Sequence, residues 1–201
     1  MAEVTIQPSS KDTDISANNA TTNYGSEINI RAGESDASTN NTRALIAFDL
    51  STIPSYAIIT SAKLNLYLYD DFASNIRIKR VYRLKRAWVE AQATWNIYST
   101  GNNWSTAGAF GADDCEQTDI GSLQFTGVEA DGWKEWELTP SAIQAMVTGA
   151  WTNNGFLIKA DTENNDMHHF YSRNYAVDTS LRPKLIITYS QPKSNPQVII
   201  F

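Results

Sequence analysis

Short segments of alternating apolar and polar residues recur along most of the chain. The alternation is clearest in residues 58–69, where small or branched apolar side chains occupy every second position. Ala62, Leu64, Leu66 and Leu68 fall on one side of an extended chain, and Lys63, Asn65, Tyr67 and Tyr69 fall on the other. A period of two residues predicts a β-strand that buries one face and exposes the other.

Other segments show the same kind of pattern at regular spacing. They are residues 28–32, 43–50, 76–84, 133–138, 155–160, 168–172 and 183–189. Turn signals separate several of them, including Asn23-Tyr24-Gly25 and Pro54. About ten short strands spaced in this way predict an all-β protein, and the long connections favour a jelly-roll β-sandwich over a simple meander.

One segment has a helical pattern instead. Thr139 is suited to the N-cap and Pro140 to the first helical position, and apolar residues then recur at intervals of three and four. Gly149 is placed to end the helix. The sequence therefore predicts one short helix near residues 140–148.

The length of 201 residues suits one domain, which we assign to residues 1–190. Residues 191–201 have the composition of a linker followed by an apolar C-terminal tail. The tail consists of Val198, Ile199, Ile200 and Phe201. Two interpretations of it are open: it packs back on its own sandwich, or it binds a neighbouring subunit as an added strand or anchor.

Composition limits the classes of partner. The net charge of −6 argues against nucleic acid, because binding to phosphates needs a basic surface. No run approaches the roughly 20 apolar residues of a membrane span. Cys115 is the only cysteine, so no intrachain disulfide is expected, and we expect a buried, unreactive thiol. Residues 1–5 do not resemble a signal peptide, so either an export signal has been removed or the protein leaves the cell by another route such as lysis.

A tryptophan-rich segment at residues 88–104 poses the main functional question. Aromatic side chains of this size dominate either a core or a surface on which sugars stack. We expect Trp88 and Trp95 to pack inside, with Glu90 and Thr94 holding loop backbone by hydrogen bonds. Trp104, in a Gly-Asn-Asn loop, is expected to be exposed and is a candidate ligand-binding residue.

The acidic loop after this segment offers candidate metal ligands. Asp113, Asp114 and Asp119 supply the hard oxygen atoms that calcium prefers, so a structural calcium ion is a candidate cofactor. The loop shows no sign of the paired carboxylates of a glycosidase, and the chain has no nucleophile elbow, so we expect a protein that is not an enzyme. His168 and His169 are adjacent on a predicted strand and must point to opposite faces.

Several motifs, in order, resemble the DNRLRE-domain family, also called disaggregatase-related repeats. They are Asn23-Tyr24-Gly25, Phe48-Asp49-Leu50, residues 61–68, Trp88-x-Glu90-x-x-x-Thr94-Trp95, Asn154-Gly155-Phe156, Ser172 and Arg182-Pro183-Lys184-Leu185. The resemblance covers roughly residues 10–190. It implies a carbohydrate-binding jelly roll of the kind attached to secreted polysaccharide-degrading enzymes and surface proteins, some of them linked to anionic polysaccharides such as alginate.

If the ligand is an anionic polysaccharide, cations on a sheet face should bind it. Arg31, Arg77, Lys79 and Arg173 are the candidates. The expected function is therefore a non-catalytic carbohydrate-binding or adhesive module, extracellular or at the cell surface. The alternative is a structural, decoration or fibre protein of a larger assembly such as a phage virion, held by the tail at residues 198–201.

Overall fold

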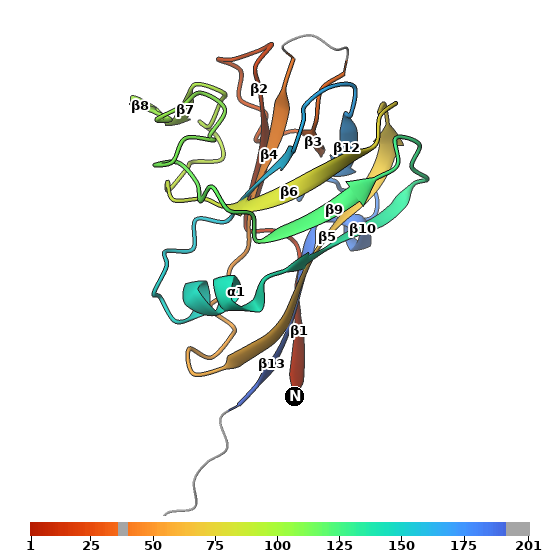
Figure 1. Ribbon diagram of the computed structural model, residues 1–201. Helices are drawn as coiled ribbons and strands as arrows, with labels where there is room; N and C mark the ends of the chain where they lie inside the picture. The colour runs from red at the N-terminus through yellow and green to blue at the C-terminus, as the bar shows by residue number, and fades with distance from the viewer. Residues whose placement is uncertain (36–39, 192–201) are drawn as a thin grey trace, which may run out of the picture.

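The computed structural model describes residues 1–35 and 40–191, which form a curled antiparallel β-sheet with one short α-helix (Figure 1). Thirteen strands lie in this described part of the chain: β1 (Ala2–Ile6), β2 (Lys11–Ser16), β3 (Asn29–Ala32), β4 (Thr42–Ala47), β5 (Ile58–Asp71), β6 (Arg77–Arg83), β7 (Ile97–Ser99), β8 (Asn102–Asn103), β9 (Gly121–Phe125), β10 (Gly132–Leu138), β11 (Phe156–Ala160), β12 (His168–Tyr171) and β13 (Lys184–Ser190). The predicted all-β sandwich class is confirmed. The apolar C-terminal tail that the sequence analysis assigned to residues 198–201 lies outside the described residues.

The sheet order explains how the strands enclose a core. The main path runs β1-β13-β5-β10-β9-β6-β11-β4-β2, and β12 pairs with the far part of β5 and with β3. A bridge between Gly33 and Thr42 then joins the end of β3 to the start of β4. The sheet therefore curls until the inner faces of β4, β6 and β11 meet those of β5, β10 and β12.

The long strand β5 is the centre of the fold. Leu64, Leu66 and Leu68 have no exposed surface, as the alternation predicted. Across the register, Trp136 of β10 pairs with Leu64 and is also fully buried. Its ring packs 5.8 Å from the ring of Phe125, so large aromatic side chains fill the space between the two layers.

The helix α1 spans Pro140–Val147 and confirms the predicted element. Pro140 occupies the first turn, and Gly149 follows the helix with a φ of 78°, a conformation that glycine adopts without strain. Ile143 and Met146 are buried against the core, and α1 packs on β5. Thr139 stands at the N-cap position, but its hydroxyl makes no capping hydrogen bond.

A second apolar cluster lies on the outer side of β4 and β11. Leu45 and Leu157 point away from the main core and are covered by Trp88 and Trp104 from the 85–115 segment. Cys115 belongs to this cluster, and burial raises the pKa of its thiol to about 12. The tryptophan-rich segment therefore gives the sandwich a third layer, which is why β4 and β11 are buried on both faces.

Candidate functional site

The expected exposure of Trp104 is wrong. Its side chain is only 4% exposed, and its indole Nε1 donates a hydrogen bond to the carbonyl oxygen of Thr94 at 2.9 Å. The strands β7 and β8 form a small hairpin that folds the Gly-Asn-Asn turn outwards and the next residue inwards. The ring packs 5.5 Å from Tyr98 and cannot serve as a sugar platform.

Trp88, Glu90 and Thr94 have the structural roles that the sequence predicted, whereas Trp95 is less buried than expected. Trp88 is 2% exposed, whereas Trp95 is partly exposed at the edge of the same cluster. Glu90 Oε1 accepts a hydrogen bond from the backbone N–H of Asp12 at 2.8 Å. Thr94 Oγ1 accepts hydrogen bonds from the next backbone N–H groups of its loop, those of residues 96 and 97. These hydrogen bonds hold the loop on the sandwich.

Lys79 is not on a solvent-facing surface, contrary to our expectation. The residues of β6 do alternate as predicted, but Lys79 and Val81 form the inner face, while Ile76 just before the strand is 61% exposed. Lys79 Nζ lies 2.9 Å from Asp166 Oδ2, and neither side chain is exposed. Lys79 therefore balances a buried carboxylate and cannot reach a polysaccharide.

The remaining candidate cations already have hydrogen-bond or ion-pair partners within the fold. Arg31 pairs with Asp14 and Arg173 pairs with Glu90, each at 2.8 Å. Arg77 donates a hydrogen bond to the carbonyl oxygen of its neighbour Ile76. The structure does not assemble these residues into a cationic face, because two of the three guanidinium groups serve ion pairs within the fold.

The three candidate calcium ligands have different surroundings and do not act together. Asp114 is fully buried, and its carboxylate accepts hydrogen bonds from Ser105, Thr106 and Gly111. Asp119 pairs with Arg80 at 3.2 Å, and Asp113 is exposed. In residues 1–35 and 40–191, no three acidic, histidine or cysteine side chains are grouped so as to hold a metal ion.

The two histidines point to opposite faces, as predicted. His168 is fully buried, with its Nδ1 2.9 Å from the carbonyl oxygen of Asp166 and its Nε2 3.4 Å from Asp71 Oδ1. Burial, helped by the nearby ammonium group of Lys79, lowers the pKa of His168 to about 4. The ring therefore stays neutral in the folded protein at neutral pH.

We expect a His168→Gln variant to lose less stability than the wild type when the pH falls from 7 to 4. An unfolded histidine takes up a proton near pH 6.5, whereas folded His168 does so only near pH 4, so the free energy of unfolding falls across this window. Burial raises the pKa of Asp12 to about 7 and that of Asp14 to about 6, which has the opposite effect but is common to both proteins. Urea unfolding at several pH values measures the difference, and parallel pH profiles would contradict the assignment.

The outer face of β5, β10 and β12 carries a cluster of aromatic side chains, which we call the tyrosine–tryptophan face. Its members are Tyr67, Tyr69, Trp133, Tyr171 and Tyr175. Since the leucines of β5 point inwards, Tyr67 and Tyr69 point outwards, and the register places Trp133 directly beside Tyr67. Tyr171 follows the buried Phe170 of β12 and joins them from the other side. All five are partly exposed.

The rings of this face are ordered by mutual packing. Tyr171 stacks on Tyr69 at 4.4 Å and on Tyr175 at 3.6 Å, with ring planes within 11° of parallel. Trp133 stands at 89° to Tyr67, so its indole is turned differently from the tyrosine stack. A hydrogen bond between Tyr171 and Tyr175 raises the pKa of Tyr171 to about 12.

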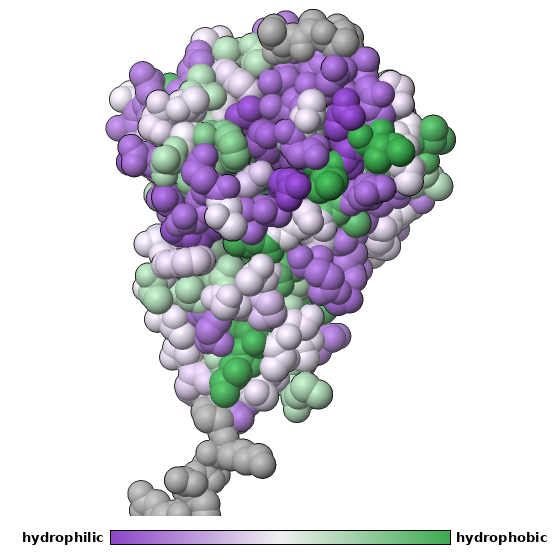
Figure 2. Space-filling model, viewed as in Figure 1, coloured by the Kyte–Doolittle hydropathy of each residue, from purple (hydrophilic) through white to green (hydrophobic). Residues whose placement is uncertain are grey.

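Polar and apolar groups border the face on opposite sides. Lys184 lies on β13, the strand that pairs with β5, and its Nζ is 3.8 Å from the centre of the Trp133 ring. At the other side, His169 lies 4.9 Å from Phe72, which is 55% exposed in the β5–β6 turn. Figure 2 shows a mostly hydrophilic surface in its upper half, with an apolar patch at the upper right over the β5–β6 and β9–β10 turns, where Ile76 and Val128 are also exposed.

Sequence reasoning noted the pieces of this face without joining them. The residues on the solvent side of 58–69 included Tyr67 and Tyr69, and residues 133–138 were expected to alternate as a strand, a pattern in which Trp133 and Trp136 fall on opposite sides. Two tyrosines on the polar side of a strand were the available signal, because a solvent-facing side usually carries charged or small polar groups. The pairing of β12 with β5 could not be inferred from the pattern.

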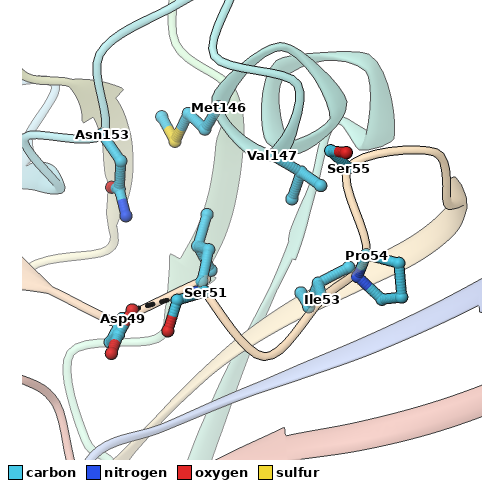
Figure 3. Close-up of a pocket in the computed structure, with 9 residues that line it drawn as sticks. Asp49, Ser51, Ile53, Pro54, Ser55, Met146, Val147 and Asn153 are labelled. Carbon is cyan, nitrogen blue, oxygen red and sulfur yellow. Dashed lines mark hydrogen bonds between the residues drawn. The ribbon is translucent and has the colours of Figure 1, made fainter.

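A hollow of about 520 Å³ lies between the 49–55 loop and the end of α1 (Figure 3). Its polar groups are used in local turns. Asp49 Oδ1 accepts a hydrogen bond from the N–H of Ser51, and Asn153 both donates to the carbonyl oxygen of Phe48 and accepts from the N–H of Gly155. No aromatic ring is among the described residues that line the hollow. It is therefore a weaker candidate site than the tyrosine–tryptophan face.

The model of the disaggregatase related repeat domain matches residues 12–187. The chain belongs to this family. The match runs from the second residue of β2 to the middle of β13, and it includes the tyrosines and the tryptophan of the outer face. No curated protein matches the chain. Among the described residues of this disaggregatase-related repeat, no helix is long and apolar enough to cross a membrane.

Proposed function

We propose that this disaggregatase-related repeat is a non-catalytic carbohydrate-binding module that holds a polysaccharide on the tyrosine–tryptophan face. The observation that carries the proposal is the gathering of five partly exposed aromatic rings on the outer side of the sheet. Large aromatic side chains without a covering layer mark interaction surfaces, since the same area would normally be buried.

The arrangement of the rings suits a sugar chain. The flat C–H-rich side of a pyranose can pack on the exposed part of the Trp133 indole, which stands at 89° to the ring of Tyr67 and has Lys184 Nζ 3.8 Å from its centre. The stacked tyrosines present ring edges and phenol groups, which can exchange hydrogen bonds with sugar hydroxyls. Because Tyr69 also accepts a hydrogen bond from Asn29 at 2.8 Å, the position of its hydroxyl is fixed before any ligand arrives.

The charges around the face favour an uncharged polymer over a polyuronate. Lys63 lies between Glu135 and Glu137, at 2.7 and 3.0 Å, so its ammonium is already neutralised. Arg31 is held by Asp14. Lys184 is left as the cation beside Trp133 with no ion pair to a described residue. Arg182, whose Nε donates a hydrogen bond to the carbonyl oxygen of Tyr175 at 2.7 Å, is a second cation beside the face. Two isolated cations can contact one or two acidic sugars but do not match the repeated charge of alginate.

Binding without catalysis is consistent with the carboxylates of this surface. Glu135 and Glu137 both lie on the exposed side of β10 and share Lys63 as a partner. Glycoside hydrolysis needs two carboxylates that face each other across the scissile bond. Two carboxylates that share one cation on an open sheet face are suited to orienting a ligand and not to cleaving it.

A Trp133→Ala variant should bind an uncharged β-glucan or mannan about 30-fold more weakly than the wild type, because an aromatic anchor of this kind contributes about 2 kcal/mol or more. Affinity electrophoresis against a panel of neutral and anionic polysaccharides identifies the polymer, and titration calorimetry gives the dissociation constant. Tyr56→Ala is the matched control, since Tyr56 is 60% exposed in the 51–57 loop, outside the face.

Two results would contradict the proposal. The first is that no polysaccharide in the panel retards the wild-type protein. The second is that Trp133→Ala and Tyr56→Ala bind with equal affinity. Tight binding to alginate with strong salt dependence would instead show that the ligand is anionic and that Lys184 has cationic partners in the complex.

A further inference from the structure

A smaller pocket lies beside the start of α1, about 260 Å³ in volume and separate from the tyrosine–tryptophan face. We call it the Trp151 pocket. Its lining includes Glu116, Thr118, Asp119, Thr139, Ser141 and Trp151. It therefore combines one large aromatic ring with two carboxylates and three hydroxyl groups.

Trp151 is held in place but remains accessible. It is 37% exposed, and its backbone N–H donates a hydrogen bond to the carbonyl oxygen of Ala145 at 2.9 Å, which anchors the residue just after α1. The guanidinium group of Arg83 lies 4.5 Å from the centre of the Trp151 ring. Because Arg83 is only 8% exposed, it supports the indole from within the fold.

The two carboxylates are oriented by arginine residues behind them. Glu116 Oε1 lies 2.6 Å from Arg83 Nη2, and this hydrogen bond, together with weaker effects of Lys85, lowers the pKa of Glu116. Asp119 lies 3.2 Å from Arg80. A carboxylate has about four acceptor sites, so each group can accept further hydrogen bonds from a ligand.

The helix N-cap supplies an independent observation. Threonine at this position normally uses its oxygen to accept a backbone N–H of the first turn, but the hydroxyl of Thr139 makes no such bond. Thr139 and Ser141 of the first turn are both among the residues that line the pocket. The hydroxyl of Thr139 is therefore available to a ligand.

We infer that the Trp151 pocket binds a single uncharged pyranose ring. The indole offers a flat surface for the C–H side of the sugar, and the carboxylates accept hydrogen bonds from neighbouring sugar hydroxyls, as ionised acceptors do strongly. Among the described residues that line the pocket there is no cation to pair with the carboxylate of a uronic acid. The volume is below the roughly 300–1,000 Å³ of pockets for larger ligands, which fits one ring. The inference depends on the proposed function only for the class of ligand.

The pocket and the tyrosine–tryptophan face are separate sites. Thr139, just beyond the end of β10, follows Trp133 by six residues, which corresponds to about 20 Å at the rise of a β-strand. Ala142 and Ile120 of the pocket also belong to the main core, whereas Trp133 lies on the outer face.

Titration with monosaccharides tests the pocket by itself. Glucose, galactose, mannose and fucose are added to the ¹⁵N-labelled protein, and the indole N–H signals are followed by NMR. We expect the signal of Trp151, assigned by its loss in Trp151→Phe, to shift with at least one of these sugars. Glu116→Gln and Asp119→Asn should each weaken the binding severalfold, whereas the exposed Asp113→Asn should leave it unchanged.

The variants separate this inference from the proposed function. Trp151→Ala should abolish the response to the monosaccharide, and Trp133→Ala should leave the monosaccharide response intact. If none of the four sugars shifts the Trp151 signal, or if Trp151→Ala still binds the sugar as detected by saturation-transfer NMR, the inference is overturned. Polymer binding that depends on Trp133 would then still support the proposed function.

Discussion

Replacing Lys79 with methionine is expected to lower the free energy of unfolding by about 3–5 kcal/mol, the usual effect of leaving one partner of a buried ion pair alone. Lys79 Nζ contacts both the carboxylate and the carbonyl oxygen of Asp166, at 2.9 and 2.7 Å, and neither side chain reaches solvent. Burial lowers the pKa of Lys79, which reflects the cost of keeping a charge inside the sandwich. Without the ammonium group, the buried carboxylate of Asp166 is left without its ion-pair partner.

Urea unfolding followed by tryptophan fluorescence measures this effect. Lys63→Met is the matched control, because Lys63 forms an exposed ion pair on β5 and its loss should leave the unfolding midpoint almost unchanged. Replacing Lys79 and Asp166 together by apolar residues should recover part of the lost stability, since no unpaired charge is then buried. Equal midpoints for Lys79→Met and Lys63→Met would contradict the buried pair.

The misplacement of Lys79 shows what periodicity can and cannot predict. The alternation in 76–84 correctly placed Lys79 and Ile78 on opposite sides of the strand. It could not tell which side faces the core, because the apolar side chain of Ile76 is exposed at the strand start while a lysine is buried. Only the pairing of Lys79 with Ala160 of β11 fixes the orientation. A pattern that assigns every lysine to the exposed side of a strand cannot predict a buried ion pair.

The candidate site was predictable only in part for a related reason. Its main residues come from three strands, β5, β10 and β12, that lie far apart in the chain, and Tyr171 is 104 positions after Tyr67. The alternation within each strand correctly indicates an outward side for Tyr67 and Trp133. Their contact depends on long-range register, which a single sequence does not encode in its local pattern.

The helix and the tryptophan motif could be predicted because their causes are local. Pro140 and Gly149 delimit α1 through backbone preferences that act within a few residues. Glu90 and Thr94 bind backbone groups as their hydrogen-bonding capacity suggested. The exposure of Trp104, in contrast, depends on how the β7–β8 hairpin folds back over the sheet.

Trp104→Ala should lower the free energy of unfolding by about 3–5 kcal/mol, the range for a buried tryptophan reduced to alanine. The variant loses the packing of the indole in the second cluster and the hydrogen bond from Nε1 to Thr94. Polysaccharide binding by the fraction that remains folded should match the wild type. Urea unfolding gives the stability, and binding measured well below the unfolding midpoint gives the affinity.

Trp133→Ala provides the opposite comparison. Trp133 lies partly exposed on the outer face, so its removal should change stability much less than that of Trp104 while it weakens ligand binding. If Trp104→Ala unfolded normally but lost polysaccharide binding, the indole would have to reach the ligand, and the buried position in the second cluster would be wrong. The two tryptophans therefore separate the residues that hold this fold together from those that contact a sugar.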